Sequence, residues 1–218
     1  MAASAPVRRL ILLRHGQTEW NATDRMQGQL DTELTELGRT QAKEAAHELS
    51  QRMPLAVISS DLTRARDTAD VLADLSGLTV ALDPRLRETF LGDWQGLTHA
   101  EVDERAPGAR VVWRRDATVS PPGGESRVDV AARSKPVVDE LISTRDDWSD
   151  RPIVLVAHGG LIAALTAALL DLPVDRWPVL GGLANTSWVQ LGAHGDRAEP
   201  SWTLDVWNAS ARVASDVL

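Results

Sequence analysis

The stretch Leu10-Ile-Leu-Leu-Arg-His-Gly16 decides the fold that the rest of the chain can adopt. Four consecutive apolar residues predict a strand that is buried on both faces, as strands of parallel sheets are. Arg14 and His15 follow directly, and Gly16 allows the backbone to turn sharply. Because ligands bind just past the carboxyl ends of such strands, a guanidinium and an imidazole emerge where chemistry is expected.

A second stretch repeats this pattern near the other end of the chain. Residues 153–159 read Ile-Val-Leu-Val-Ala-His-Gly, again a buried strand that ends in His-Gly. We therefore expect the two strands to bring His15 and His158 to one edge of the sheet.

Composition indicates a globular protein with one sizeable core. The 218 residues are 43% hydrophobic and 25% charged, so we expect a single domain over residues 1–218. A net charge of −8 argues against nucleic acid or an anionic membrane as the main partner. The absence of cysteine excludes disulfides, thiolate metal sites and a cysteine nucleophile. Because no apolar run approaches the ~20 residues of a membrane span and no signal peptide is recognisable, we expect a cytoplasmic protein.

Strands and helices are expected to alternate along the chain, which predicts an α/β protein with three α/β/α layers and a mostly parallel central sheet. Further strands are predicted at 55–60, 78–82, 153–157, 188–191 and 202–206. Helices are predicted from the N-cap Thr35 to Pro54, from the N-cap Asp61 to Gly77, from about Ser126 to Thr144, and over 160–170. The inward faces of the first two helices are expected to carry Leu37, Ala42, Ala45, Ala46, Leu49 and Met53, and then Leu62, Ala65, Ala69, Leu72 and Leu75.

Two segments depart from this alternation. Residues 17–33 are polar and too irregular for a helix, so we expect a loop at the end of the first strand. Residues 89–124 contain a short helical pattern at Thr98 to Arg105 and the turn-rich Ser120-Pro-Pro-Gly-Gly. We expect this insertion to pack over the strand ends as a lid.

Residues suited to an anion follow the predicted strands. Arg64 lies in the first turn of the second helix, and Glu88 follows the third strand. Together with Arg14, His15 and His158 they would place two histidines, two arginines and one glutamate on one rim. Arginine forks and a helix N-terminus suit phosphate oxygens. Each residue alone has an ordinary structural explanation, so the hypothesis depends on their convergence. No buried strand precedes the other histidines, which we expect to be structural: His47, His99 and His194.

The motifs around these residues resemble, in order, those of the histidine phosphatase superfamily, also called the phosphoglycerate mutase-like family. They are Arg14-His-Gly-Gln-Thr-Glu-Trp-Asn with Arg25-Met-Gln-Gly, Ser59-Ser-Asp-Leu-Thr-Arg-Ala, Leu86-Arg-Glu with Gly92-Asp-Trp-Gln-Gly, Gly124-Glu-Ser, and His158-Gly-Gly. The resemblance covers residues 10 to about 170 and implies the phosphoglycerate mutase-like fold.

The resemblance also implies a mechanism. His15 would attack phosphorus, and Glu88 would protonate the leaving alkoxide and then activate water. The phosphoryl oxygens would be held by Arg14, Arg64 and His158. Asn21 matches a further phosphate contact, while Gln27, Gly28 and Gly159 lie where family members contact substrate. No metal and no other cofactor is implied.

Within the family, four stretches look most like the branch that hydrolyses glucosyl-3-phosphoglycerate to glucosylglycerate and phosphate. They are Gln29-Leu-Asp-Thr-Glu-Leu, Leu91-Gly-Asp-Trp-Gln-Gly-Leu-Thr-His-Ala, His158-Gly-Gly-Leu-Ile-Ala-Ala-Leu and the late Leu-Asp-Val-Trp-Asn-Ala-Ser. The partner implied is this small phosphorylated substrate, and an apolar, Trp-rich C-terminal third is compatible with a homodimer. Alternatives are a cofactor-dependent phosphoglycerate mutase, a broad-specificity phosphomonoesterase and a non-catalytic protein that binds phosphate esters.

Discrimination among substrates would come from the loops. A glyceryl carboxylate calls for cationic or amide partners, and Arg25, Gln27, Arg114 and Arg115 are candidates. A sugar favours an aromatic surface, for which Trp20, Trp94 and Trp113 are candidates.

Overall fold

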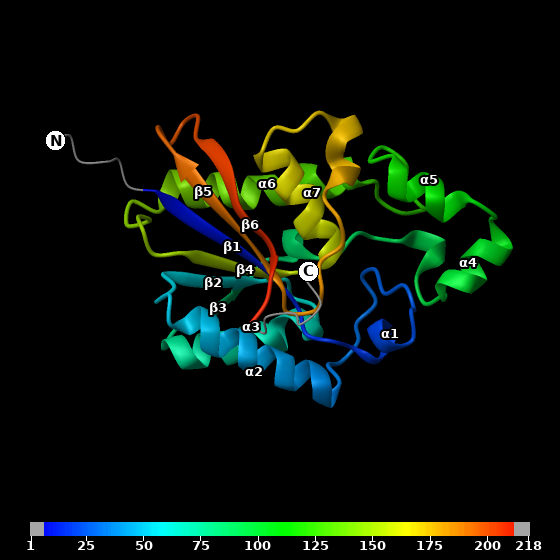
Figure 1. Ribbon diagram of the computed structural model, residues 1–218, viewed down its shortest axis with the longest axis horizontal. Helices are drawn as coiled ribbons and strands as arrows, with labels where there is room; N and C mark the ends of the chain where they lie inside the picture. Colours follow the sequence, from blue (N-terminus) through cyan, green and yellow to red (C-terminus); the bar gives the residue numbers. More distant parts are fainter. Residues whose placement is uncertain (1–6, 212–218) are drawn as a thin grey trace, which may run out of the picture.

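A six-stranded sheet in the order β3-β2-β4-β1-β5-β6 forms the centre of the molecule in the computed structural model, which describes residues 7–211 (Figure 1). The strands are β1 (Arg8–Arg14), β2 (Ala56–Ser59), β3 (Val80–Leu82), β4 (Ile153–Ala157), β5 (Trp188–His194) and β6 (Ser201–Ala209). The β3-β2, β2-β4 and β4-β1 pairs are parallel, whereas β5 runs antiparallel to β1 and to β6. The expected mostly parallel sheet is confirmed.

Helices cover both faces of this sheet. On one face lie α2 (Glu36–Ser50) and α3 (Thr63–Ser76), and on the other α6 (Arg127–Thr144) and α7 (Gly159–Leu169) (Figure 1). Successive residues of β1 alternate between the two layers, because Leu10 and Leu12 join one hydrophobic cluster and Ile11 and Leu13 join the other. The predicted three-layer α/β/α arrangement is therefore confirmed.

The register of the two central strands positions the catalytic candidates. Leu10 pairs with Ile153 and Arg14 with Ala157, so the residues that follow, His15 and His158, leave neighbouring parallel strands at the same level. The amide of His15 also donates to the carbonyl of Ala157.

Most predicted helix boundaries are confirmed, but one cap is wrong. Thr35 accepts a hydrogen bond from the Gly38 amide at 3.0 Å as the N-cap of α2, Ser126 caps α6, and Gly77 ends α3 in the left-handed region. Asp61 does not cap α3, because its carboxylate pairs with Arg87. Asp31, from the loop after β1, instead accepts from the Thr63 amide at 2.9 Å.

The inward faces of α2 and α3 are confirmed except for three residues. Leu37, Met53 and Leu75 are 48%, 66% and 57% exposed. Met53 lies beyond the end of α2, and Leu75 lies in the last turn of α3. Gly38, and not Leu37, is in helical register with the buried positions of α2, and it packs so closely against the carbonyl of Gln17 that no Cβ fits there.

We expected residues 17–33 to form a loop without helix, and this expectation is wrong. The segment contains α1 (Glu19–Ala22), a single turn with Thr18 as N-cap. The turn forms because the Thr18 and Asn21 side chains each bond the other's backbone amide, a reciprocal cap that a search for apolar periodicity does not detect.

Residues 89–124 pack over the carboxyl ends of the strands and are called the lid here. They contain η2 (Gly92–Trp94), α4 (His99–Arg105) and α5 (Ala109–Arg115), of which α5 was not predicted. The lid has a small core of its own around Leu91, Trp94 and Val102, which Met26 joins from the loop after β1. Figure 1 shows α4 and α5 as a lobe beside the sheet.

Two short 3-10 helices complete the described elements: η1 (Pro84–Leu86), which precedes Glu88, and η3 (Val174–Val179), which follows α7. Among residues 7–211, none of the helices is both long enough and apolar enough to cross a membrane.

Candidate active site

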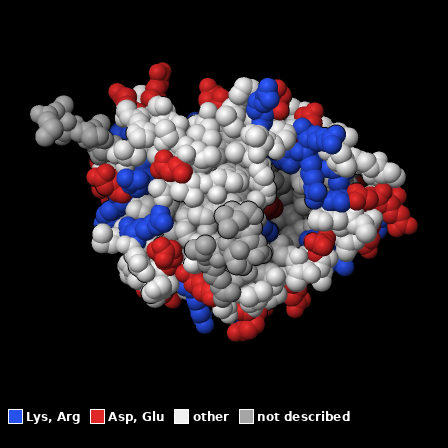
Figure 2. Space-filling model, in the orientation of Figure 1, with Lys and Arg blue, Asp and Glu red and all other residues white. Residues whose placement is uncertain are grey.

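A cavity of about 530 Å³ opens at the carboxyl ends of the parallel strands, between the sheet and the lid. Figure 2 shows the hollow, with Lys and Arg side chains gathered on its rim over α5. Eight of the nine residues expected to act in catalysis or to contact substrate line it: Arg14, His15, Asn21, Gln27, Gly28, Arg64, Glu88 and Gly159. His158 does not line it but lies fully buried against His15, with the ring centroids 5.1 Å apart. The structure thus brings all of the candidates together.

The imidazole of His15 is held in one tautomer. Its Nδ1 lies 2.7 Å from the carbonyl oxygen of Gly16, and a carbonyl can only accept, so Nδ1 carries the hydrogen and donates. Nε2 is then the nitrogen with a free lone pair. Burial, and next the neighbouring cations of Arg64 and Arg14, hold the pKa of His15 well below its usual value, which keeps the ring neutral. A neutral ring with an unprotonated Nε2 is a nucleophile.

Backbone carbonyls orient the two arginines beside it. Arg64 donates to the carbonyls of Leu30 and Gly28 at 2.9 and 2.8 Å, and Arg14 donates to the carbonyl of Leu183. No protein acceptor meets the buried Nε of either arginine within the described residues. Burial lowers the pKa of Arg64 to about 10, so both guanidinium groups remain charged at neutral pH. These donors and charges suit the oxygens of a phosphoryl group.

A serine that sequence reasoning missed orients His158. The Nε2 of His158 lies 2.9 Å from Ser60 Oγ, and that oxygen also accepts from the Leu62 amide at 3.3 Å. The other ring nitrogen, Nδ1, is buried without a protein partner in the described part of the chain. Burial and the charge of Arg64 hold the pKa of His158 well below its usual value. The Ser59-Ser60 pair belongs to the second motif, which is the signal that could have found this residue.

The carboxylate of Glu88 lies against the N-terminus of α7. Its Oε1 accepts from the amides of Thr89 and Leu161 at 2.8 and 3.0 Å, and Oε2 accepts from the amide of Gly160 at 3.1 Å. A Cβ at Gly160 would lie 2.6 Å from Oε1. The approach of Glu88 to the helix therefore requires glycine at this position.

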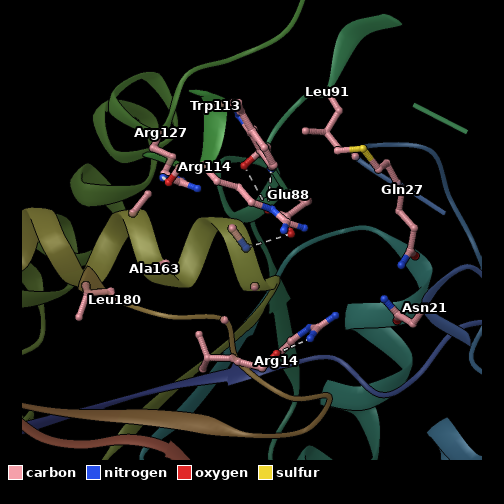
Figure 3. Close-up of a pocket in the computed structure, with 18 of the residues that line it drawn as sticks. Arg14, Asn21, Gln27, Glu88, Leu91, Trp113, Arg114, Arg127, Ala163 and Leu180 are labelled. Carbon is pink, nitrogen blue, oxygen red and sulfur yellow. Dashed lines mark hydrogen bonds between the residues drawn. The ribbon is translucent and has the colours of Figure 1, made fainter. Parts of the chain in front are cut away.

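Two amide side chains turn their donors toward the cavity. The Oδ1 of Asn21 already accepts from the Thr18 amide, the Thr18 hydroxyl and Asn185 Nδ2, which leaves its NH₂ group for a ligand. The Oε1 of Gln27 accepts from the Thr32 hydroxyl at 2.6 Å, which likewise leaves the NH₂ group of Gln27 for a ligand. Figure 3 shows Asn21 and Gln27 on one side of the cavity.

The far side of the cavity belongs largely to the lid. We call Arg14, His15, Arg64 and His158 the phosphoryl end, and His99, Trp113, Arg114 and Arg127 the lid end. Arg127, the first residue of α6, was not predicted, because the Gly124-Glu-Ser motif ends at the residue before it. His99 was expected to be purely structural, yet it lines the cavity.

Several residues proposed from the sequence for substrate discrimination do not line the cavity. Arg115 and Trp20 lie outside its lining, and Trp94 is buried in the lid core, where it packs edge-on against Trp113 with ring centroids 5.7 Å apart. Arg25 does line it, but its guanidinium donates to the carbonyl of Gly96 and lies 3.9 Å from Glu101. Trp177, which was not predicted, contributes part of the wall.

Comparison with known proteins agrees with this geometry. The family model of the histidine phosphatase superfamily (branch 1) matches residues 10–210. Glucosyl-3-phosphoglycerate phosphatase of Mycolicibacterium vanbaalenii is 65% identical, with 97% of this chain and 99% of that protein aligned. The protein of the same name from Mycobacterium tuberculosis is 63% identical over the same shares. A solved structure of mycobacterial glucosyl-3-phosphoglycerate phosphatase complexed with VO3 superposes with a TM-score of 0.91 at 65% identity, covering 93% of this chain and all of that one. This chain therefore belongs to the histidine phosphatase superfamily.

Proposed function

We propose that the protein hydrolyses glucosyl-3-phosphoglycerate to glucosylglycerate and phosphate through a phosphohistidine intermediate. The observation that carries the reaction type is the state of His15. Its imidazole is neutral, its Nδ1 donates to the Gly16 carbonyl, and it shares the cavity with the charged Arg14 and Arg64.

In the first step, Nε2 of His15 attacks phosphorus as the bond from phosphorus to the ester oxygen breaks. Arg14 and Arg64 neutralise the phosphoryl oxygens, and Asn21 adds an amide donor. Glu88 passes a proton to the departing alkoxide, which leaves as the alcohol of glucosylglycerate. Because Oε2 accepts from a single protein donor among residues 7–211, the amide of Gly160, it keeps room for that proton.

In the second step, Glu88, now a carboxylate, takes a proton from the water that attacks phosphohistidine. The phosphorus–nitrogen bond breaks, phosphate forms, and Nε2 regains its lone pair while Nδ1 keeps its hydrogen. The Gly16 carbonyl thus preserves the reactive tautomer through the whole cycle.

His158 would act as a hydrogen-bond donor to the phosphoryl group. Because Ser60 Oγ accepts from the Leu62 amide, its own hydrogen is available to His158 Nε2. That arrangement puts the ring hydrogen of His158 on Nδ1, the nitrogen without a protein partner. Ser60 is in this way a positioning residue for the phosphoryl end.

Two observations support the substrate. Relatives that are 63–65% identical over nearly their whole length are named for this reaction. The cavity, at about 530 Å³, is also of the size of small-molecule sites and much larger than phosphate alone needs.

Side-by-side kinetics test the substrate. We expect kcat/KM for glucosyl-3-phosphoglycerate to exceed that for 3-phosphoglycerate at least ~10-fold, which requires only about 1.4 kcal/mol of extra transition-state binding. Equal values would remove the glucosyl ester as the preferred substrate and leave the family mechanism in place.

A second assay separates hydrolysis from mutase transfer. With 3-phosphoglycerate and a bisphosphoglycerate primer, we expect phosphate release and little 2-phosphoglycerate. Efficient interconversion of the two phosphoglycerates would favour the mutase instead.

A homodimer in the cytoplasm remains part of the proposal. Among the described residues, β6 forms one edge of the sheet and exposes Leu204 and Val206, and an edge strand of this kind can pair with a second copy. Light scattering should give twice the mass of the chain, and the mass of one chain would exclude the dimer.

A further inference from the structure

Arg127 is a half-buried cation at the lid end for which the described structure provides no acid. Its Nη1 donates to the carbonyl of Arg114 at 3.0 Å, and its guanidinium lies over the ring of Trp113, 5.4 Å from the centroid. No Asp or Glu of residues 7–211 lies within ion-pair distance of it. Since burying an unpaired charge is costly, this side chain calls for an explanation.

Two neighbouring arginines do form ion pairs with acidic residues. Arg110, also on α5, is bound by Asp103 at 2.7 Å, and Arg133, two turns along α6 from Arg127, is bound by Glu125 at 2.8 Å. The Arg114 side chain, like Arg127, lines the cavity with no acid in ion-pair contact among the described residues. Arg105 and Arg115 also have no acid within ion-pair distance among the described residues, but both are exposed to solvent and lie outside the cavity lining. Arg127 differs from them because it is half-buried and lines the cavity.

The position of Arg127 relative to Glu88 indicates which part of a substrate it would meet. In Figure 3, Trp113, Arg114 and Arg127 lie on one side of Glu88, and Arg14 and Asn21 lie on the other. Glu88 must reach the ester oxygen, and Arg14 holds the phosphoryl group. The lid end therefore faces the leaving group.

We propose that Arg127, with Arg114 beside it, forms an anion subsite that binds the carboxylate of the substrate and selects phosphorylated hydroxy acids over uncharged phosphate esters. This inference rests on the proposed function for its phosphoryl chemistry and deepens it by naming the group that is recognised. A planar guanidinium matches a carboxylate with two parallel hydrogen bonds, and stacking on Trp113 orients that plane.

The electrostatics of the site agree with an anion at this place. Burial, and next the charge of Arg114, lower the pKa of Arg127, whereas Glu88 acts in the opposite direction. A bound carboxylate would offset the repulsion between the two guanidinium groups, as Asp103 and Glu125 offset the charges of Arg110 and Arg133.

The test compares two esters that differ only in the recognised group, 3-phosphoglycerate and glycerol 3-phosphate. We expect Arg127→Met to lower kcat/KM for 3-phosphoglycerate ~10- to 100-fold and to leave that for glycerol 3-phosphate within ~3-fold. Arg127→Lys, which keeps the charge without the planar fork, should recover part of the loss. Arg105→Met, which removes an exposed charge of the lid outside the cavity lining, is the matched control and should change neither value by more than ~3-fold.

A purely structural role for Arg127 predicts a different result. If the residue only joins α5 to α6, both esters lose the same factor, and that outcome overturns the proposal, as does a variant that loses nothing. Neither ester contains the sugar, so this comparison tests the carboxylate subsite even if the glucosyl ester is not the preferred substrate. If wild type turns over neither ester, calorimetry with His15→Ala measures the same pair as ligands. If Arg127→Met leaves the affinity for 3-phosphoglycerate unchanged in that measurement, the proposal is again overturned.

Discussion

The phosphoryl end and the lid end of the cavity differ in what holds their side chains. At the phosphoryl end, backbone carbonyls hold the functional groups: that of Gly16 holds His15, and those of Leu30 and Gly28 hold Arg64. At the lid end, Arg127 lies over the ring of Trp113 and donates to the carbonyl of Arg114, so both of its contacts are with α5, which packs with the small separate core of the lid.

This difference separates two tasks. Groups held by the backbone at the ends of packed strands keep one geometry, as attack on phosphorus requires. Groups held by a separately packed lid can change without disturbing the sheet. Substitutions at the phosphoryl end should therefore reduce the reaction of every substrate, whereas substitutions at the lid end should change the preference among substrates.

The largest effect should come from the nucleophile. His15→Ala should reduce turnover of every phosphate ester at least about 10⁴-fold, because the remaining groups can bind phosphate but cannot accept it. Rapid quench with labelled substrate should trap an acid-labile, base-stable phosphoprotein in wild type and none in the variant. His47→Ala, at a histidine on the outer face of α2, is the control and should label normally. Normal labelling of His15→Ala would refute the assignment.

Glu88 should have the next largest effect, and it should depend on the leaving group. Glu88→Gln should lose roughly 10²–10⁴-fold in kcat on alkyl phosphates, the usual range for general acid–base catalysis. p-Nitrophenyl phosphate, whose leaving group needs no proton, should lose less. Equal losses on both esters would argue against a general acid.

A Gly160→Ala variant tests whether the close packing of Glu88 against α7 is needed for proton transfer. In Gly160→Ala the new Cβ would lie 2.6 Å from Glu88 Oε1, so the carboxylate must move. We expect a roughly 10- to 100-fold lower kcat on alkyl phosphates, with the cooperative thermal unfolding of wild type preserved.

A double variant shows whether this loss acts through Glu88. Gly160→Ala combined with Glu88→Gln should be little worse than Glu88→Gln alone, because both changes remove the same function. Losses that multiply would show that Gly160 acts through another part of the site.

The same contrast explains what could be predicted from the sequence. β1 and β4 are recognisable as uninterrupted apolar runs, and chain order alone places His15, Arg64, Glu88 and His158 after strands of one sheet. The geometry of a parallel sheet then brings these residues to one edge.

The lid end was harder to predict because no local pattern determines it. Arg127 reaches the cavity only because α5 and α6 come together across the turn that follows the lid helices, and α5 itself was not anticipated. Trp94 and Trp113 both belong to the lid, yet one is buried in the lid core and the other lines the cavity. Such a difference depends on contacts between residues that are distant in sequence.

The smallest expected effect concerns the pH dependence of stability, and it again separates the two ends. The pKa values of His15 and His158 are held well below 6.5 by burial, so the folded protein binds fewer protons than the unfolded chain just below that pH. The free energy of unfolding should therefore rise with pH in this range and fall on acidification below about 6.5, by up to ~1.4 kcal/mol per pH unit for each histidine. His99, at the lid end, is only half-buried, and the lowering of its pKa should contribute less.

Urea unfolding at pH 7.5, 6.5 and 5.5 measures this dependence. His15→Asn should remove about half of the fall seen in wild type, since two buried histidines contribute, and His99→Asn should leave most of it. The comparison uses the change with pH within each variant, so a general loss of stability does not affect it. A wild-type unfolding free energy that is constant from pH 7.5 to 5.5 would mean that the histidines are not neutral in the folded state, and the nucleophile would then need another source of its free lone pair.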